Sequence, residues 1–310
     1  MARGIAFVYP GQGSHRADMA APWHGTPHAQ VIDQLSAAVG LDLATVANDA
    51  EACGASTAIG QPSIMAASLA ADRALRAAGV IPDVVAGHSL GEVTAAAAAG
   101  VLTLAAAGEV VAERGRSMGD ACRSTPGSMA AVVKMDRLDV EAILADFDGV
   151  TIANENAVGQ VVVSGAMPLF EGAVAALKAA GGRAIALRVE GAFHSPVMTP
   201  AVVCLDAVLR RQDLADPMVP LVTGVSGEVL RSASAVQRNL IDGILSPVQW
   251  VAVQDRLLAL GVEVLVEVGP GGVLSALARR AHPGLLVASV SKPEDIAAVV
   301  ALVTAAPAHV

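Results

Sequence analysis

Apolar runs of strand length alternate with helical patterns along both ends of this chain. Residues 5–9 form a continuous apolar run, which ends at the glycine-rich turn Pro10-Gly11-Gln12-Gly13-Ser14. Helical patterns extend from there to about residue 78, and a second strand-like run follows at residues 84–86. Three further buried strands are expected later in the chain, at residues 220–225, 262–268 and 285–290. Apolar strands separated by helices predict a parallel sheet that helices cover on both faces.

Strands and helices follow one another in a different order in the middle of the chain. Strand-like and helical patterns follow one another in the order βαββαβ, at residues 128–134, 138–147, 150–154, 160–164, 167–180 and 183–189. This order is that of the ferredoxin-like split arrangement. We therefore predict a small α+β subdomain at residues 126–190, inserted into a large α/β subdomain that residues 1–125 and 191–310 form together.

The composition narrows the class of protein. Hydrophobic residues make up 54% of the 310 residues but aromatic residues only 2%, so alanine, valine and leucine must fill the core. The formal net charge of −9 argues against a nucleic-acid partner, because phosphate binding needs a basic stripe. The uncharged run at residues 93–108 is rich in alanine and too short to span a bilayer. Met1 leads almost directly into a strand, which leaves no room for a signal peptide.

The cysteines point to a reducing compartment. Cys53, Cys122 and Cys204 are scattered along the chain and odd in number. Neither a disulfide framework nor a metal site is predicted from such spacing. A cytoplasmic protein fits this pattern best.

The pentapeptide Gly87-His88-Ser89-Leu90-Gly91 is the strongest single motif. It follows the strand-like run at residues 84–86 and opens into an alanine-rich helical stretch. G-x-S-x-G between a strand and a helix is a nucleophile elbow, which raises the serine hydroxyl above the end of an α/β-hydrolase-like sheet. Free backbone N–H groups at the helix N-terminus lie beside such a serine and can stabilise an oxyanion. We therefore predict that Ser89 is a nucleophile.

A serine hydroxyl needs a positioned base to act as a nucleophile at neutral pH. His194 lies in Gly191-Ala192-Phe193-His194-Ser195, where the predicted small subdomain rejoins the large one. A histidine at such a junction faces the cleft between the subdomains and can meet Ser89 there. The alternative at this point is a structural histidine on a loop.

Several motifs, and the order in which they occur along the chain, resemble those of the malonyl-CoA:acyl carrier protein transacylases, the FabD-like enzymes and polyketide trans-acyltransferases. The resemblance covers essentially the whole chain and combines these segments: Pro10-Gly11-Gln12-Gly13-Ser14, Gly87-His88-Ser89-Leu90-Gly91-Glu92, Arg114-Gly115-Arg116-Ser117-Met118, Asn156 to Gly165, Gly191-Ala192-Phe193-His194 and Glu267-Val268-Gly269-Pro270-Gly271. It implies that a malonyl group passes from malonyl-CoA to Ser89, and then to the phosphopantetheine thiol of an acyl carrier protein. His194 acts as the base in both steps of this ping-pong transfer.

The resemblance also implies supporting roles. Backbone N–H groups of Gln12 and Leu90 form the oxyanion hole, and the backbone carbonyl at Gly243 orients His194. Gln61 resembles an active-site glutamine of the family, although an amide that caps a helix beside Pro62 is the alternative. The substrate-binding set implied by the motifs is Gln61, Arg114, Met118, Asn156 and Phe193.

Arg114 is the expected specificity residue. A malonyl group carries a free carboxylate, which a guanidinium grips through two parallel hydrogen bonds. The alternative is a solvated helix arginine paired with Glu113 or Asp120. Phe193 is bulky and should crowd an α-branched acyl group, and Leu90 after the serine also favours malonyl over methylmalonyl.

Other functions are compatible with parts of this pattern. A transferase for another carboxyacyl group would also use Arg114, and an acyl hydrolase that edits carrier proteins would use the same Ser89 and His194. A non-catalytic module that docks carrier proteins is disfavoured, because both residues are present. No metal or cofactor is expected, since coenzyme A enters only as part of the substrate.

An acidic carrier protein needs a local basic patch on an enzyme of net charge −9. The candidates are Arg183 and Arg188 in the small subdomain, with Arg116 and Arg123 near the cleft. Each can equally be a solvated surface residue. A monomer is usual for the family that this chain resembles.

Overall fold

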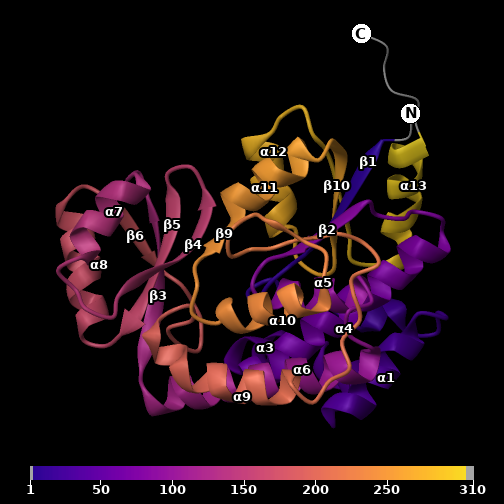
Figure 1. The fold of residues 1–310 in the computed structure, drawn as a ribbon, viewed down its shortest axis with the longest axis horizontal. Helices are drawn as coiled ribbons and strands as arrows, with labels where there is room; N and C mark the ends of the chain where they lie inside the picture. Colours follow the sequence, from indigo (N-terminus) through magenta and orange to yellow (C-terminus); the bar gives the residue numbers. More distant parts are fainter. Residues whose placement is uncertain (1–2, 305–310) are drawn as a thin grey trace.

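The computed structural model describes residues 3–304, which fold around two sheets that lie side by side (Figure 1). The larger sheet has the strand order β11-β10-β1-β2-β7-β8. Its strands are β1 (Gly4–Tyr9), β2 (Val84–Gly87), β7 (Leu221–Val222), β8 (Val229–Leu230), β10 (Val262–Val268) and β11 (Leu286–Val290). The first five strands of this order pair in parallel, and β8 is antiparallel to β7. The predicted parallel core is confirmed.

Helices cover both faces of this sheet. They are α1 (Ala29–Val39), α2 (Leu43–Val46), α3 (Ala50–Ala55), α4 (Thr57–Ala77), α5 (Leu90–Ala98), α6 (Leu104–Ser124), α9 (Thr199–Leu209), α10 (Ala233–Asp242), α11 (Trp250–Ala259), α12 (Val273–Ala281) and α13 (Ile296–Thr304). Side chains of β1 alternate between two cores: Phe7 and Tyr9 pack in the core with α4, α5 and α6, whereas Ala6 and Val8 pack in the core with α11 and α12. Burial on both faces explains why β1 is a continuous apolar run rather than an alternating one.

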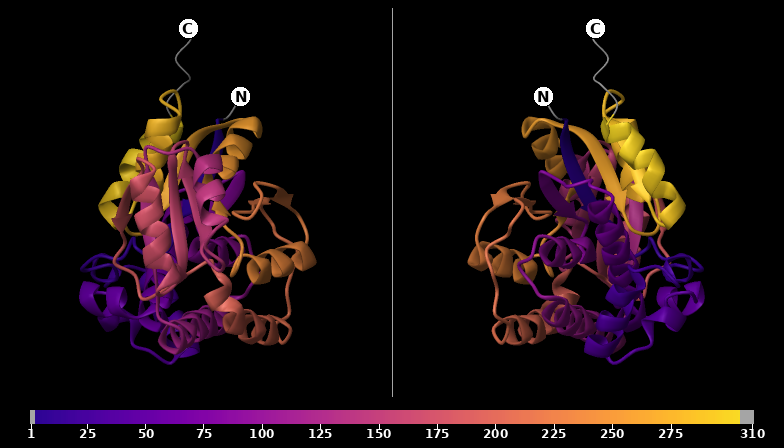
Figure 2. Two further views of the ribbon diagram at one scale, coloured as in Figure 1. Left: turned by 90° about the vertical axis from the view of Figure 1, so that its left-hand side faces the viewer. Right: turned by 90° about the vertical axis from the view of Figure 1, so that its right-hand side faces the viewer.

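The smaller sheet belongs to the middle of the chain. Its elements are β3 (Gly127–Val133), α7 (Arg137–Leu144), β4 (Thr151–Ala157), β5 (Gln160–Ala166), α8 (Leu169–Ala179) and β6 (Arg183–Ala186). The strand order β6-β3-β5-β4, antiparallel throughout, is the ferredoxin-like arrangement that the βαββαβ order predicts. Helices α7 and α8 cover the outer face of this sheet, and its other face looks toward the large subdomain (Figures 1 and 2).

The structure adds two short strands that the sequence did not predict, β8 in the large sheet and β9 in the small one. β9 (Val248–Gln249) comes from the C-terminal half of the chain and pairs in parallel with β4, which extends the small sheet to five strands. The segment between α10 and α11 is thereby attached to the small sheet. The subdomain ranges 1–125 with 191–310 and 126–190 stay a prediction, and residues 1–2 and 305–310 lie outside the described residues.

Two predicted strands are shorter in the structure. β7 ends at Val222 rather than at residue 225, because Thr223 accepts from the N–H of Gly227 in a tight turn into β8. β6 ends at Ala186 rather than at residue 189, and the chain beyond it runs along the cleft. In residues 3–304 no helix is both long enough and apolar enough to cross a membrane.

Candidate active site

The strand β2 and the helix α5 hold Ser89 in a sharp turn. Ser89 has φ 53° and ψ −105°, a backbone conformation that residues other than glycine rarely adopt. A Cβ on Gly87 would lie 1.9 Å from the carbonyl carbon of Gly91, and a Cβ on Gly91 would lie 2.0 Å from the carbonyl oxygen of Tyr9. Both glycines of the G-x-S-x-G motif are therefore required by close backbone contact, and the predicted elbow is present.

The strain at Ser89 gives a stability prediction. Glycine normally stabilises a folded chain less than alanine does, because it loses more conformational freedom on folding. At this positive φ we expect the opposite order, with Ser89→Gly having a free energy of unfolding about 1 kcal/mol above that of Ser89→Ala. Urea unfolding of both variants measures the difference. A Ser89→Ala variant that is the more stable of the two would contradict the assignment of strain.

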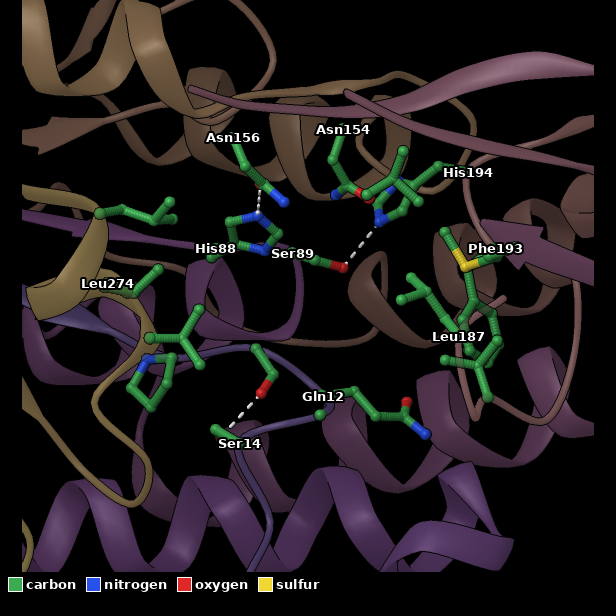
Figure 3. A pocket seen from close by; sticks show the side chains of 18 of the residues that line it. Gln12, Ser14, His88, Ser89, Asn154, Asn156, Leu187, Phe193, His194 and Leu274 are labelled. Atoms are coloured by element: carbon green, nitrogen blue, oxygen red, sulfur yellow. Dashed lines mark hydrogen bonds between the residues drawn. The ribbon is translucent and has the colours of Figure 1, made fainter. Parts of the chain in front are cut away.

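His194 meets Ser89 across the cleft. The Ser89 Oγ lies 2.8 Å from His194 Nε2, and Figure 3 shows the two side chains pointing toward each other. His194 also has a positive φ of 56°. Its Nδ1 lies 2.9 Å from the carbonyl oxygen of Ser246, which can only accept, so Nδ1 carries the proton. Nε2 is then the free acceptor that faces the serine hydroxyl.

The carbonyl that lies 2.9 Å from His194 Nδ1 is that of Ser246, three residues after the predicted Gly243, whose carbonyl makes the weaker contact with the ring. After α10 the chain continues in a tight turn, in which the N–H of Ser246 donates to the carbonyl of Asp242 at 3.0 Å. This turn brings the Ser246 carbonyl onto the imidazole ring. The Gly243 carbonyl also raises the pKa of His194, but less than the Ser246 carbonyl does.

Burial keeps His194 neutral. Burial, followed by the positive charge of Arg114, lowers the pKa of the imidazole to about 3. The side chain is 3% exposed. At neutral pH the ring is therefore in the form that accepts a proton from Ser89.

The side chain of Arg114 extends from α6 to the Ser89 hydroxyl. One guanidinium nitrogen donates to Oε1 of Gln61 at 2.7 Å and another donates to the Ser89 Oγ at 3.1 Å. Burial lowers the pKa of the guanidinium and the charge of Glu92 opposes this effect; at the resulting value of about 10, Arg114 stays protonated at neutral pH. Within residues 3–304 no carboxylate forms an ion pair with Arg114. A buried cation without a paired anion is suited to an anionic ligand.

Arg114 is not a solvated arginine paired with Glu113 or Asp120, and Gln61 is not a helix cap. Glu113 and Asp120 form ion pairs with Arg116, not with Arg114. Gln61 lies inside α4 rather than at its start, and its amide donates to Oε1 of Gln12 at 3.3 Å. Gln12, Gln61 and Arg114 thus form one hydrogen-bonded row that ends at Ser89.

Gln12, Ser89, Arg114 and His194 line a cavity of about 220 Å³ between the two subdomains. Gln61, predicted to bind substrate, is not among the lining residues and lies behind Gln12 and Arg114, to which it is hydrogen-bonded. The predicted substrate-binding residues Met118, Asn156 and Phe193 all line it (Figure 3 labels the last two). Much of the remaining wall is apolar, formed by Met129, Val162, Leu187, Val189, Leu274 and Leu277. The cavity is therefore an apolar slot with a cation beside the nucleophile, which suits a small acyl chain that ends in a carboxylate.

Asn156 and His88 join the subdomains at this cavity. His88 Nε2 lies 2.9 Å from Oδ1 of Asn156, as Figure 3 shows, and the His88 ring packs against Trp250 with centroids 5.5 Å apart. Burial lowers the pKa of His88. The Asn156 oxygen is thus held by His88, and its amide nitrogen is the group that remains for a substrate.

Asn154 is a site residue that the sequence analysis missed. It lines the cavity two positions before Asn156 on β4, and it is 6% exposed. The prediction of Asn156 could have been extended to Asn154, because every second side chain of a strand lies on the same face.

The backbone around Ser89 matches the expected oxyanion hole. Gln12 follows β1 in the glycine-rich turn, and Leu90 is the first residue of α5. Neither N–H donates to another group among the described residues. Both are therefore free to bind a developing negative charge.

The four candidate docking arginines separate into two kinds. Arg116 pairs with Glu113 and Asp120 at 2.6 and 2.7 Å, and Arg123 pairs with Asp120 and Glu190. Arg183 and Arg188 are exposed and form no ion pair in the part of the chain that the structure describes. Neighbouring acids offset the charge of Arg116 and Arg123, so Arg183 and Arg188 are the better candidates.

A serine on an elbow above a parallel sheet, with a neutral histidine against its hydroxyl, defines an enzyme of the acyl-transferring and acyl-hydrolysing class. A profile of the acyl transferase domain matches residues 6–300. The malonyl CoA-acyl carrier protein transacylase of Bacillus subtilis is 36% identical over 303 residues, which cover 94% of this chain and 95% of that protein. The chain belongs to this family of acyl transferases.

Solved structures agree with that assignment. The malonyl CoA-acyl carrier protein transacylase of Coxiella burnetii matches with a TM-score of 0.93 at 29% identity, over 98% of this chain and 99% of that one. A malonyl-transacylase in complex with its type II PKS acyl-carrier protein matches with a TM-score of 0.90 at 32% identity, over 95% of this chain and 98% of that one. The two-subdomain α/β fold is thus that of the family.

Proposed function

We propose that this enzyme transfers a malonyl group from malonyl-CoA to the phosphopantetheine thiol of an acyl carrier protein, in fatty acid or polyketide biosynthesis. The observation that carries the proposal is the buried guanidinium of Arg114, which has no carboxylate partner in residues 3–304 and lies 3.1 Å from the Ser89 hydroxyl. A malonyl thioester supplies the missing carboxylate one methylene away from the carbon that the serine attacks. The names of the relatives support the same substrate.

In the first half-reaction the Ser89 Oγ attacks the thioester carbonyl of malonyl-CoA while His194 Nε2 takes the hydroxyl proton. The N–H groups of Gln12 and Leu90 bind the oxyanion of the tetrahedral intermediate. The intermediate collapses with cleavage of the carbon–sulfur bond, and His194 returns the proton to the departing coenzyme A thiolate. The product is malonyl-Ser89.

In the second half-reaction the malonyl group moves from Ser89 to the carrier protein. His194 takes the proton of the carrier's phosphopantetheine thiol, and the resulting thiolate attacks the malonyl ester. Collapse of the intermediate releases the Ser89 Oγ, which recovers the proton from His194. The bound carboxylate neutralises Arg114 throughout, which removes one of the two largest causes that lower the pKa of His194.

The depressed pKa of His194 predicts a flat pH profile. For acylation by malonyl-CoA, kcat/KM reports the protonation state of the free enzyme. Because the imidazole of the free enzyme titrates at about 3, we expect kcat/KM to change less than about twofold from pH 6 to 8. A histidine with the ordinary pKa near 6.5 would give an increase of about fourfold over that range. A limb centred near pH 6.5 that disappears in His194→Ala would contradict the neutral assignment.

The proposal is tested by following the two half-reactions separately. Enzyme incubated with radiolabelled malonyl-CoA should retain label after denaturation, and addition of a phosphopantetheinylated carrier protein should move that label to the carrier. Release of malonate to water at the same rate with or without the carrier would indicate an acyl hydrolase instead. Retention of a different dicarboxylic acyl group in preference to malonyl would indicate a specialised carboxyacyl transferase.

Charge reversal tests the docking surface. The variant Arg183→Glu with Arg188→Glu should slow transfer from malonyl-enzyme to the carrier by about tenfold or more, because like charges now face an acidic partner. Acylation by malonyl-CoA should stay unchanged. The matched control is Arg116→Glu, an exposed arginine already paired with acids. Equal losses in both half-reactions, or an equal loss in the control, would remove the docking assignment.

No cofactor is needed, because the thioester is already an activated acyl donor and His194 carries every proton. The free thiols of Cys53, Cys122 and Cys204 support a cytoplasmic location. We propose a monomer, as the resemblance to the family implies.

A further inference from the structure

Glu92 is a buried carboxylate that takes no part in the proposed chemistry. It lies in the first turn of α5, three residues after Ser89, and is 4% exposed. Its Oε1 accepts from the backbone N–H of Gly224 at 2.6 Å and from Nδ2 of Asn239 at 2.9 Å. Burial raises the pKa of the carboxyl, and these two hydrogen bonds oppose the effect. Such a group is costly to bury unless hydrogen bonds replace those it makes to water, and Gly224 and Asn239 supply them here.

Asn239 connects this carboxylate to the catalytic histidine. It lies on α10, and its carbonyl accepts from the N–H of Gly243 at 2.8 Å, at the start of the turn that ends at Ser246. The Ser246 carbonyl then accepts from His194 Nδ1 at 2.9 Å. One continuous path thus runs from the helix of the nucleophile, through α10, to the ring of the base.

The turn also packs directly on Glu92. A Cβ built on Gly243 would lie 3.3 Å from Oε2 of Glu92, so there is little room between the carboxylate and the backbone of the turn. Asn239 is held from its other side as well, because its Oδ1 accepts from the hydroxyl of Thr223. A shift of Asn239 would therefore move the Ser246 carbonyl.

We propose that Glu92 is a positioning residue for His194. Its carboxylate holds Asn239, and through the turn after α10 it fixes the carbonyl that selects the tautomer and orientation of the imidazole. In a Ser–His–acid triad a carboxylate contacts the histidine directly. Here the Ser246 carbonyl contacts the histidine, and the Glu92 carboxylate fixes the position of that carbonyl through Asn239 and the turn. The inference rests on the proposed function in that it assigns Ser89 and His194 the roles of nucleophile and base.

A second role for the same carboxylate makes a different prediction. Glu92 is also the charge that opposes the lowered pKa of Arg114. If it served mainly as the counter-charge of Arg114, its loss would change the binding of malonyl and leave neutral acyl donors unaffected. As a positioning residue for His194, it affects all reactions of Ser89 by the same factor.

The test compares Glu92→Ala, Glu92→Gln and Asn239→Ala in the full chain. Two rates are measured for each: acylation by malonyl-CoA, and labelling of Ser89 by a fluorophosphonate, which needs the base but no carboxylate site. We expect Glu92→Ala and Asn239→Ala each to lower both rates by the same factor of about 10 to 100, as for a small misplacement of a catalytic group. Glu92→Gln keeps an oxygen that accepts from Gly224 and Asn239, so both rates should stay within about threefold of wild type.

Two further readouts separate positioning from plain loss of stability. The Nδ1 proton of His194 should give a downfield NMR signal in wild type and in Glu92→Gln, and the signal should shift or broaden in Asn239→Ala. The double variant Glu92→Ala with Asn239→Ala should be no slower than either single variant, because both act on one path. If Glu92→Ala does not fold, Asn239→Ala carries the same test.

Several outcomes would overturn the proposal. Wild-type labelling rates in a folded Glu92→Ala or Asn239→Ala variant would show that His194 does not depend on this path. Loss of malonyl acylation with normal fluorophosphonate labelling would assign Glu92 to Arg114 instead. A wild-type enzyme that reacts with the fluorophosphonate but not with malonyl-CoA would refute the proposed substrate and leave the positioning role standing, whereas failure to react with either would refute both.

Discussion

Replacing His194 with alanine is expected to slow acylation of the enzyme by malonyl-CoA by about 10⁴-fold. The imidazole accepts the Ser89 proton through an Nε2 that is 2.8 Å away, and no other described histidine approaches the Ser89 hydroxyl within hydrogen-bond distance. General bases of this kind contribute about 10² to 10⁴ in rate, and loss of one member of a Ser–His pair falls at the upper end. Rapid-quench measurement of malonyl-enzyme formation gives the rate constant directly.

The matched control is His24→Ala. His24 is an exposed histidine at the end of a short 3-10 helix and is not among the residues that line the cavity. Its removal should leave the rate constant unchanged. A His194→Ala variant that keeps more than about a tenth of wild-type activity would remove this residue from the role of base.

Replacing Arg114 with alanine is expected to lower kcat/KM for malonyl-CoA by about 10³-fold. Truncating one partner of a buried, hydrogen-bonded charge pair costs about 2 to 5 kcal/mol, and about 4 kcal/mol within that range corresponds to this factor. Acylation by acetyl-CoA, which has no carboxylate, should change by less than about tenfold. The preference for malonyl over acetyl should therefore collapse, and competition between the two donors measures it.

Two other variants make the Arg114 result specific. Arg114→Lys keeps the charge but cannot form two parallel hydrogen bonds to a carboxylate, so most of the malonyl preference should still be lost. Arg116→Ala removes an exposed arginine from the same helix and should change neither donor. Equal losses for malonyl-CoA and acetyl-CoA in Arg114→Ala would show that the guanidinium supports the fold or the hydroxyl rather than the carboxylate.

The parts of the site that depend on side-chain identity could be predicted from the sequence. Ser89 lies in a turn that only the pattern of flanking glycines permits, and the contacts of Gly87 and Gly91 show why. His194 and Arg114 lie in motifs of the family, and the structure brings both to the Ser89 hydroxyl. The ferredoxin-like insertion followed from the order of its elements, because βαββαβ leaves few ways to pair four strands.

Features that depend on the backbone or on surface neighbours could not be predicted in the same way. The carbonyl at Ser246 has no side-chain signature, and its identity depends on how tightly the chain turns after α10. β9 is two residues long and pairs with a strand about 90 positions away, which no local pattern indicates. The ion pairs of Arg116 and Arg123 involve exposed side chains whose partners are decided by helix geometry as much as by sequence.

The central claim is that Ser89 carries a malonyl group during turnover, and intact-mass spectrometry with peptide mapping tests it most directly. Wild-type enzyme, incubated briefly with malonyl-CoA and denatured in acid, should gain the mass of one malonyl group on the peptide that contains Ser89. Addition of a phosphopantetheinylated carrier protein before denaturation should remove that mass, and Ser89→Ala should never gain it. Turnover by wild type without a covalent adduct, or an adduct that persists in Ser89→Ala, would contradict the account.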